Sequence, residues 1–371
     1  MKKTYVSLVS QEAIPNVQYI KEFSQEIKTF LFISTNRMEK DNRAHLIVDA
    51  CKLPINSFHI EIVDEEDFIA IKEGIENAFK NPIFNDSEGY IVNCTLGTKV
   101  MSIALFDYFR AKPNADIFYT PIGKNAYRSI IDNSTNELFK SKISVEEYVT
   151  GYGIKIKGLG TPLFNTSQYT ENFLSAYLEF RDFEFDVLKH LQLDENQKYR
   201  NKGIKDFRAI QGLSKFLTTI QFPSKENGKL SKYEVKYLTG GWFEEWVFYK
   251  IKDYFKFEAS DIVLGLNSFL EAENDLDVVF MYKNDIHIIE CKTAIPDTQL
   301  QQSTLYKSGA LVEKFGRNAH TYLFTLSNLR DNDGEFKKSI KERSLQQKVT
   351  IADRYTLISE LETFIKEKIL R

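Results

Sequence analysis

The sequence has few cysteines, no long apolar run and no complete signal peptide. Its three cysteines stand at positions 51, 94 and 291, an odd number at distant positions that excludes a disulfide framework and cysteine-based zinc spacing. No stretch approaches the roughly 20 apolar residues that cross a bilayer. The apolar run near the N-terminus breaks at Gln11 and Glu12, too early for a secretory signal. We therefore predict a cytoplasmic protein with no membrane segment.

An excess of basic charge is also lacking. The formal net charge of −3 excludes a uniformly basic surface but leaves room for a local basic groove. Hydrophobic residues make up 43% of the chain and charged residues 27%, as in an ordinary globular protein. Because 371 residues exceed the size at which one hydrophobic core usually stops growing, we predict two domains.

The N-terminal part, to about residue 120, alternates short apolar runs with amphipathic segments, which is typical of a parallel sheet wrapped by helices. Helices are expected over Glu66–Phe79 and Thr98–Phe109, where apolar residues recur at helical spacing. The expected strands are Tyr5–Val9, Phe30–Ser34, Phe58–Val63, Tyr90–Cys94 and Asp116–Thr120. This is a Rossmann-like α/β arrangement, and such sheets bind ligands beyond the carboxyl ends of their strands.

The glycine-bearing stretch Thr150–Thr161 is expected to join this domain to a second one. A helical, charged region follows, from about Gln168 to Leu217. The rest of the chain predicts another α/β unit. Its expected elements are helix Trp242–Phe255, strands Leu276–Tyr282 and Ile286–Cys291, helix Thr298–Phe315 and strand Thr321–Thr325.

The two adjacent strands of the second unit carry its charged residues and are close enough in sequence to form a hairpin. Side chains alternate along a strand, so Glu290 and Lys292 share one face while Cys291 points to the other. Asp277, on the first strand, joins Glu290 and Lys292 only if the hairpin loop has an even number of residues.

Two hairpin loops meet this requirement, and the sequence leaves both open. A two-residue turn at Lys283–Asn284 places Asp277 opposite Glu290, and one at Asn284–Asp285 places it opposite Lys292. Either register puts two carboxylates and an ammonium on one side of the hairpin.

Such a cluster, flanked by Val, Ile and Phe, costs stability unless its charges are compensated. A divalent cation compensates them, because Asp277, Glu290, the backbone carbonyl of Cys291 and waters form an oxygen site suited to Mg²⁺ or Mn²⁺. The ion would acidify a water and stabilise charge on a phosphate, while Lys292 adds a second positive charge. The pattern therefore predicts a metal-dependent phosphodiester hydrolase.

Asp277 followed by Glu290-Cys291-Lys292 resembles the motif of the PD-(D/E)xK nucleases, although no proline precedes Asp277. The resemblance implies a restriction-endonuclease-like α/β domain with a further catalytic acid on the preceding helix. Glu244 and Glu245 both stand at that place, and we favour Glu244 as the fourth catalytic residue beside Asp277, Glu290 and Lys292.

The stretch Asn93–Ser102 runs from a predicted strand into a predicted helix. Gly97 allows close approach of a ligand, and the amides of Thr98 and Lys99 at the helix N-terminus, with the Lys99 charge, form an anion site. The Walker spacing is missing. From the residues alone, a well-capped helix with Lys99 in solvent explains the pattern slightly better than an anion site does.

This loop, Asn-Cys-Thr-Leu-Gly-Thr-Lys, resembles the Asn-x-Thr-Gly-Gly-Thr-Lys signature of CARF domains, which sense cyclic oligoadenylates in type III CRISPR immunity. Leu96 replaces the first glycine of the signature. The resemblance implies a ligand pocket built from this loop and from the neighbouring strand ends. The implied pocket residues are Ser10, Gln11, Asn16, Ser34, Thr35, Thr95, Leu96, Gly97, Thr98 and Lys99.

Together the two resemblances span nearly the whole chain. They imply a CARF domain over residues 1–145, a linker over 146–165, and a nuclease domain over 166–371 whose N-terminal part is helical and basic. They further imply a nuclease that cleaves single-stranded DNA or RNA when cyclic tetra-adenylate binds. The ring has four phosphates and approximate two-fold symmetry, so we expect a homodimer that offers it both copies of Lys99.

Two other functions are compatible with parts of the sequence. A ligand-sensing regulator would bind nucleic acid without cutting it, but it has no use for the acid–lysine cluster. An ungated restriction-type nuclease has no use for the Lys99 loop. The basic stretch Lys198–Arg208 either lines a nucleic-acid channel or forms a solvated helix face.

Overall fold

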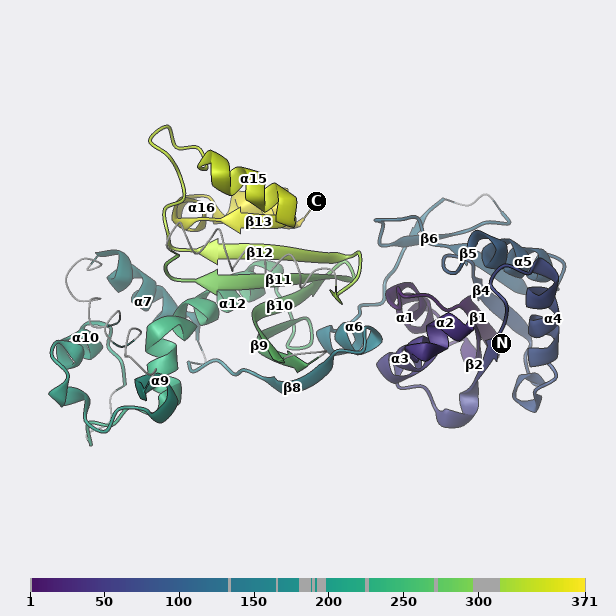
Figure 1. The fold of residues 1–371 in the computed structure, drawn as a ribbon, viewed down its shortest axis with the longest axis horizontal. Helices are drawn as coiled ribbons and strands as arrows, with labels where there is room; N and C mark the ends of the chain where they lie inside the picture. The colour runs from purple at the N-terminus through teal and green to yellow at the C-terminus, as the bar shows by residue number, and fades with distance from the viewer. Residues whose placement is uncertain are drawn as a thin grey trace.

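Two β-sheets organise the chain, one in each half (Figure 1). The structure is a computed structural model of the protein. It describes residues 2–132, 135–164, 166–179, 188, 191, 198–223, 227–269, 273–295 and 314–370.

The first sheet has the strand order β3-β2-β1-β4-β5-β6-β7. Its strands are β1 (Lys3–Leu8), β2 (Ile27–Ser34), β3 (Phe58–Ile62), β4 (Gly89–Asn93), β5 (Ala115–Tyr119), β6 (Ala126–Ser129) and β7 (Glu137–Leu138). Strands β1 to β5 pair in parallel, whereas β6 pairs antiparallel with β5. The five predicted strands are all present. The sheet is of the predicted Rossmann-like kind, extended by two short strands.

Helices cover both faces of this sheet. They are α1 (Ile14–Glu22), α2 (Asn36–Lys40), α3 (Arg43–Cys51), α4 (Phe68–Ala78) and α5 (Lys99–Phe109). Neighbouring residues of β1 point to opposite layers: Tyr5 packs in the cluster that contains Ile47 of α3, and Val6 in the cluster that contains Leu105 of α5. A sheet buried on both faces explains why its strands read as continuous apolar runs.

The second sheet has the order β13-β12-β11-β10-β9-β8. Its strands are β8 (Lys155–Leu159), β9 (Ile262–Phe269), β10 (Glu273–Tyr282), β11 (Asp285–Lys292), β12 (Ala319–Thr325) and β13 (Val349–Ala352). Strands β8 to β11 pair antiparallel, and β11 to β13 pair in parallel. The carboxyl ends of β11, β12 and β13 therefore meet at one edge.

One face of the second sheet packs against α12 (Trp242–Phe255), whose bounds are those predicted. Further helices among the described residues of this half are α7 (Ser167–Glu179), α9 (Lys198–Lys202), α10 (Leu213–Thr219), α11 (Lys232–Lys236), α15 (Lys338–Gln347), α16 (Arg354–Ser359) and α17 (Leu361–Phe364), with a 3-10 turn at Phe207–Ala209 and a π-helical turn at Ile365–Ile369. A π-helical turn, Tyr237–Gly241, joins α11 to α12. In Figure 1 the helices α7, α9 and α10 form a lobe beyond the end of the sheet to which the β11 arrow points.

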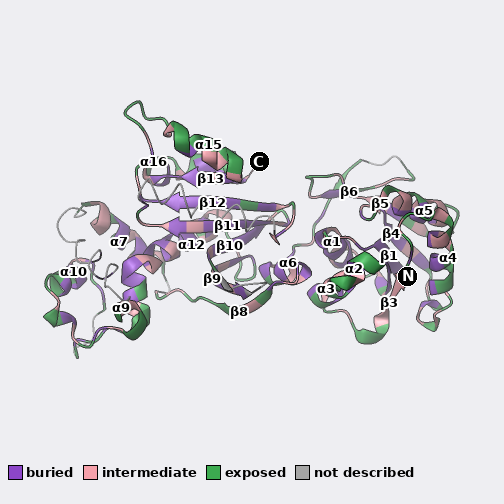
Figure 2. Cartoon of the chain, viewed as in Figure 1, coloured by how far each residue is buried: buried purple, intermediate pink, exposed green. Residues whose placement is uncertain are grey.

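The strands β1, β2, β4, β11 and β12 are mostly buried, whereas β8 and the outer faces of α4 and α15 are exposed (Figure 2). Among the described residues, none of the helices combines the length and the apolar character that crossing a bilayer requires. Most of the predicted helix Thr298–Phe315 lies outside the described residues.

The segment 146–165, expected as a linker, contains regular structure. It holds most of α6 (Val145–Gly151) and all of β8, which pairs with β9 at the edge of the second sheet. One glycine, Gly158, and two exposed lysines leave β8 without the apolar pattern that would have predicted a strand.

One apolar cluster joins the two halves through α6. Val17 of α1 and Tyr148 of α6 belong to it together with Val279 of β10 and Ile288 of β11. The Tyr148 hydroxyl also donates a hydrogen bond of 2.8 Å to the carbonyl of Phe315, just before β12. The first domain and the second sheet therefore share a buried core.

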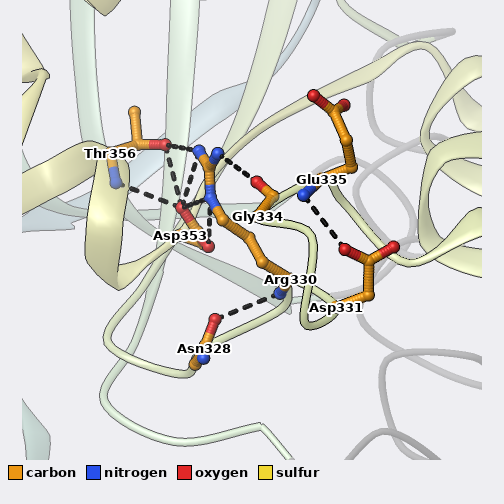
Figure 3. A network of polar contacts seen from close by, with 7 residues as sticks. All are labelled: Asn328, Arg330, Asp331, Gly334, Glu335, Asp353 and Thr356. Carbon is orange, nitrogen blue, oxygen red and sulfur yellow. Dashed lines mark hydrogen bonds and ion pairs between the residues drawn. The ribbon is translucent and has the colours of Figure 1, made fainter.

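A polar network stabilises the edge where β12 and β13 end (Figure 3). Asp353 has no exposed surface, and the Arg330 guanidinium donates to it over 3.2 Å and to the Thr356 hydroxyl over 3.0 Å. Asp353 also accepts the Thr356 backbone N–H at 3.1 Å and so caps α16. This network holds the chain that follows β12, the strand paired with β11, and the chain that follows β13.

We predict that Asp353→Ala lowers the free energy of unfolding by about 3 kcal/mol, because it leaves the largely buried Arg330 charge uncompensated. Urea titration followed by tryptophan fluorescence measures the change. Lys338→Ala breaks an exposed ion pair of 3.9 Å with Glu342 and should leave stability unaltered. Equal effects of the two substitutions would contradict the structural importance of the network.

Candidate active site

The hairpin of β10 and β11 adopts the first of the two predicted registers. Lys283 and Asn284 have φ angles of 52° and 64°, which identify a two-residue turn with both central residues in the left-handed region. The pairs run from Tyr282↔Asp285 to Val278↔Ile289. One further step places Asp277 opposite Glu290.

The Lys292 ammonium contacts the three groups predicted as metal ligands. Its nitrogen forms an ion pair with Glu290 Oε1, lies 3.7 Å from Asp277 Oδ2, and donates over 3.2 Å to the carbonyl of Cys291. Asp277 Oδ2 in turn accepts the Cys291 backbone N–H at 2.7 Å. Three oxygens therefore converge on one positively charged nitrogen at the end of the hairpin.

The two candidate acids of α12 lie in different surroundings. Glu244 is close enough to Lys292, Glu290 and Asp275 for their charges to affect the pKa of its carboxyl. Glu245 is buried and accepts the backbone N–H groups of Leu163 and Phe164. The structure therefore brings Glu244 to the cluster, whereas Glu245 ties the chain that follows β8 to α12.

Burial dominates the electrostatics of the cluster. It raises the pKa of Asp277 well above its usual range, and the charges of Glu244 and Glu290 raise it further. It also raises the pKa of Glu244. Burial disfavours the Lys292 ammonium, but Asp277 and Glu290 outweigh this effect and raise the pKa of Lys292. The acids are thus crowded, and the lysine stays charged.

Among the described residues, no three His, Cys, Asp or Glu side chains form a ready set of metal ligands. Two carboxylates and a carbonyl do surround one cation, the Lys292 ammonium. All three are oxygen donors, which suits Mg²⁺ or Mn²⁺ when waters complete the shell. The donor set fits an open, hydrated site, provided that Lys292 moves aside.

The predicted sensor residues gather at the carboxyl ends of β1, β2 and β4, which are neighbours in the first sheet. Gln11, Gly97 and Lys99 are exposed at this edge. Gly97 has a φ of 79°, and a Cβ there would lie 2.8 Å from the Leu8 side chain, so the loop requires glycine. Lys99 opens α5.

Several predicted sensor residues have structural partners. Thr98 caps α5 by accepting the Met101 N–H at 3.1 Å. Thr35 likewise caps α2, Ser34 is buried against Glu39, and the Thr95 hydroxyl accepts the Thr120 N–H at 3.0 Å. Leu96 is buried. Half-buried Ser10 accepts the Glu12 N–H at 3.1 Å. Their contacts with a ligand stay predictions.

Asn16 lies inside the domain rather than on the surface of this edge. It has no exposed surface, and its amide bonds to Tyr5 Oη at 2.8 Å, Asn93 Nδ2 at 3.1 Å and the Leu8 carbonyl at 3.1 Å. These contacts join β1, α1 and β4. In this structure Asn16 is therefore a buried residue that holds the carboxyl ends of β1 and β4 together.

Two residues outside the predicted site lists also belong to these regions, and one of them lies in the basic stretch Lys198–Arg208. Arg200 of α9 is close enough to lower the pKa of the Glu244 carboxyl. Glu12 follows the sensor residue Gln11 and accepts a 2.7 Å hydrogen bond from the Tyr152 hydroxyl of the connecting segment. The basic character of its segment was the sequence feature that pointed to Arg200. No sequence feature pointed to Glu12.

Fold and site define the class: a two-domain protein with a Rossmann-like sensor domain and a nuclease-type domain built on an acid–lysine hairpin. Residues 4–148 match the family model of the Card1 CARF domain, and residues 231–347 match that of the Card1-like endonuclease domain. The chain therefore belongs to the proteins that join a CARF domain to a Card1-like endonuclease domain.

Solved structures of similar fold cover nearly the whole chain. Can2 from Sulfobacillus thermosulfidooxidans, in complex with cyclic tetra-adenylate, has a TM-score of 0.70 at 20% identity, covering 98% of this chain and 99% of that one. Protein VC1899 from Vibrio cholerae has a TM-score of 0.74 at 18% identity, covering 98% and 97%. A type III CRISPR defence DNA nuclease activated by cyclic oligoadenylate has a TM-score of 0.60 at 12% identity, covering 99% and 52%. A search of curated protein sequences found no match.

We predict that Asp277→Asn stabilises the metal-free protein at pH 8 by on the order of 1 kcal/mol. The folded protein raises the pKa of Asp277, so between the ordinary and the raised value it holds a proton that the unfolded chain releases. Stability therefore falls as pH rises through this window, and the gain from asparagine should shrink towards pH 5.

Thermal unfolding in EDTA at both pH values tests this prediction. Asp333→Asn removes the same charge from an exposed position in the loop before α15 and serves as the control. A gain that is equal for both variants, or equal at both pH values, would refute the argument.

Proposed function

We propose that this protein is an endonuclease that depends on Mg²⁺ or Mn²⁺ and cleaves single-stranded nucleic acid when a cyclic oligoadenylate, cyclic tetra-adenylate, binds to a homodimer. The observation that carries the proposal is the convergence of Asp277, Glu290 and the Cys291 carbonyl on the Lys292 ammonium. Its support is that this cluster lies in a domain of the Card1-like endonuclease family.

In this proposal Asp277, Glu290 and the Cys291 carbonyl hold the metal ion. The bound ion supplies a Lewis acid for the phosphate and an acidified water. Lys292 gives up its place among these oxygens and turns towards the phosphate. There Lys292 supplies a positive charge beside the phosphate. Glu244, whose carboxyl pKa is raised, is the group suited to accept a proton from the attacking water.

For the activator we propose the edge that contains Gly97 and Lys99. An N-terminus of a helix with an adjacent lysine binds a phosphate, and a two-fold dimer offers two such sites to a ring of four phosphates. The fold shared with Can2, whose structure contains cyclic tetra-adenylate, supports this ring size.

In this proposal, a structural change caused by ring binding is transmitted to the nuclease domain through α6 and the chain before β12. Glu12, next to Gln11, accepts the Tyr152 hydroxyl at 2.7 Å and lies 3.8 Å from Arg317. The neighbouring residue Asn318 accepts the N–H of Ile286 at 3.2 Å, at the start of β11. A ligand that shifts Glu12 therefore acts on the strand that carries Glu290 and Lys292.

The central experiment incubates purified protein with Mn²⁺, labelled single-stranded DNA or RNA, and each cyclic oligoadenylate in turn. We expect cleavage with cyclic tetra-adenylate only. Glu290→Gln should remain folded and bind the ring while losing at least about 100-fold in rate, since it removes a metal ligand. Lys99→Ala should lose the response to the ring but keep metal binding. Undiminished cleavage by Glu290→Gln would end the proposal.

A second prediction concerns the coupling of the domains. Tyr152→Phe removes the hydroxyl that donates to Glu12 and should lower the ratio of cleavage rates with and without the ring by about tenfold, a coupling energy of about 1.4 kcal/mol. The matched control is Tyr127→Phe, which removes a 3.1 Å hydrogen bond to Glu137 within the first domain. An unchanged ratio in the Tyr152 variant would exclude this route.

A further inference from the structure

Helix α9 is fixed beside the segment that leads into α12. Ile204, just after α9, exchanges backbone hydrogen bonds of 2.7 and 3.0 Å with Leu230. Gly203 has a φ of 77°, and a Cβ there would lie 2.5 Å from the Leu230 carbonyl oxygen, so the two chain segments are in backbone contact. Leu230 precedes α11, which continues through the π-helical turn to Glu244 in the first turn of α12. Tyr199 of α9 packs against the apolar cluster that contains Trp242 and Phe243 of α12, so the basic helix lies beside the first turn of α12.

Arg200 is the α9 residue whose charge acts on the carboxylate cluster. Its side chain is half-buried, and its charge lowers the pKa of the Glu244 carboxyl. Among the described residues, no carboxylate lies within ion-pair distance of it. Other arginines differ: Arg208 is paired with Asp206 at 2.7 Å and Arg330 with Asp353 at 3.2 Å. Arg200 therefore lies in the field of the acids without neutralising one of them.

A half-buried guanidinium beside a metal-binding cluster suits a phosphate. It presents a rigid fork of N–H donors that matches two phosphate oxygens. Exposed lysines of the same segment, Lys198, Lys202 and Lys205, add positive charge beside Arg200. A flexible polyanion at this surface meets one arginine and several lysines.

We propose that Arg200 binds a backbone phosphate next to the scissile phosphodiester, and that Lys198, Lys202 and Lys205 extend this contact along a single strand. The inference rests on the proposed nuclease function and assigns the α9 segment as its substrate-binding surface. Arg200 is then a residue that positions the substrate, and the lysines contribute affinity that does not depend on base sequence.

The binding experiment uses the full-length Glu290→Gln protein with Mn²⁺ and cyclic tetra-adenylate, so that the strand is bound but not cut. Fluorescence anisotropy with a labelled single-stranded oligonucleotide gives Kd over a range of salt concentrations. When Arg200→Gln is introduced into this Glu290→Gln protein, binding should weaken by about tenfold or more. The slope of log Kd against log salt should fall by about 0.7, because the protein neutralises one phosphate fewer. Lys202→Gln with Lys205→Gln should lower the slope further.

Lys341→Gln is the matched control, because it removes one charge from an exposed position on α15, which packs against β13 at the opposite edge of the sheet from β8. It should change neither Kd nor the slope. Arg200→Lys in the otherwise unaltered enzyme keeps the charge but loses the fork, so kcat/KM should lie between those of the parent protein and Arg200→Gln.

A purely structural role for Arg200 gives a different result. If Arg200 only offsets the charge of the acids, Arg200→Gln changes Mn²⁺ affinity and thermal stability but leaves oligonucleotide Kd and its salt slope unaltered, which overturns the inference. If the parent protein cleaves no nucleic acid with any ring, the proposed function fails. The anisotropy series then still decides whether Arg200 binds phosphate.

Discussion

The structure depends on one electrostatic arrangement: two acids held in a largely buried position around a single ammonium at the end of a hairpin. Asp277 and Glu290 repel each other, and burial strengthens that repulsion. Lys292 offsets it, and the Cys291 N–H adds one hydrogen bond to Asp277. A charged cluster of this kind persists only where the surrounding chain over-determines its geometry.

Hydrogen bonds at both ends of the β10–β11 hairpin hold the geometry of the cluster. At the end that carries the acid–lysine cluster, the Lys292 carbonyl accepts the Leu326 N–H at 3.2 Å, so the strand is tied to the chain that follows β12. At the other end, Asn284 is buried, and its side chain accepts the Ile143 N–H at 2.8 Å and donates to Asn125 at 2.9 Å and Ser141 at 3.1 Å. The turn of the hairpin is therefore bonded to the end of the first domain, and the same two strands carry the acid–lysine cluster and the contact with that domain.

The sequence predicted the parts of this arrangement that follow from periodicity. Strand alternation placed Glu290 and Lys292 on one face, and the requirement for an even loop left two registers, of which the Lys283–Asn284 turn is the one observed. It did not identify β9, because Gly265 and Asn267 interrupt its apolar pattern, nor β8, which is paired on one side only and largely exposed. Contacts between distant segments leave no local periodicity. The Asn16 network and the bond of Asn284 to the first domain were therefore beyond sequence reasoning.

Periodicity also could not separate Glu244 from Glu245, since adjacent residues of a helix differ by only about 100° in direction. Tertiary contacts separate them, because the N–H groups of Leu163 and Phe164 require an acceptor and Glu245 supplies it. The two acids of α12 therefore differ in their surroundings. Glu245 bonds the chain that follows β8 to the helix, and Glu244 lies in the electrostatic field of Lys292 and Arg200. Without the hydrogen bonds from Leu163 and Phe164 to Glu245, the start of α12 would lose the contacts that determine the position of Glu244. The position of the candidate acid therefore depends on its neighbour as much as on the hairpin it faces.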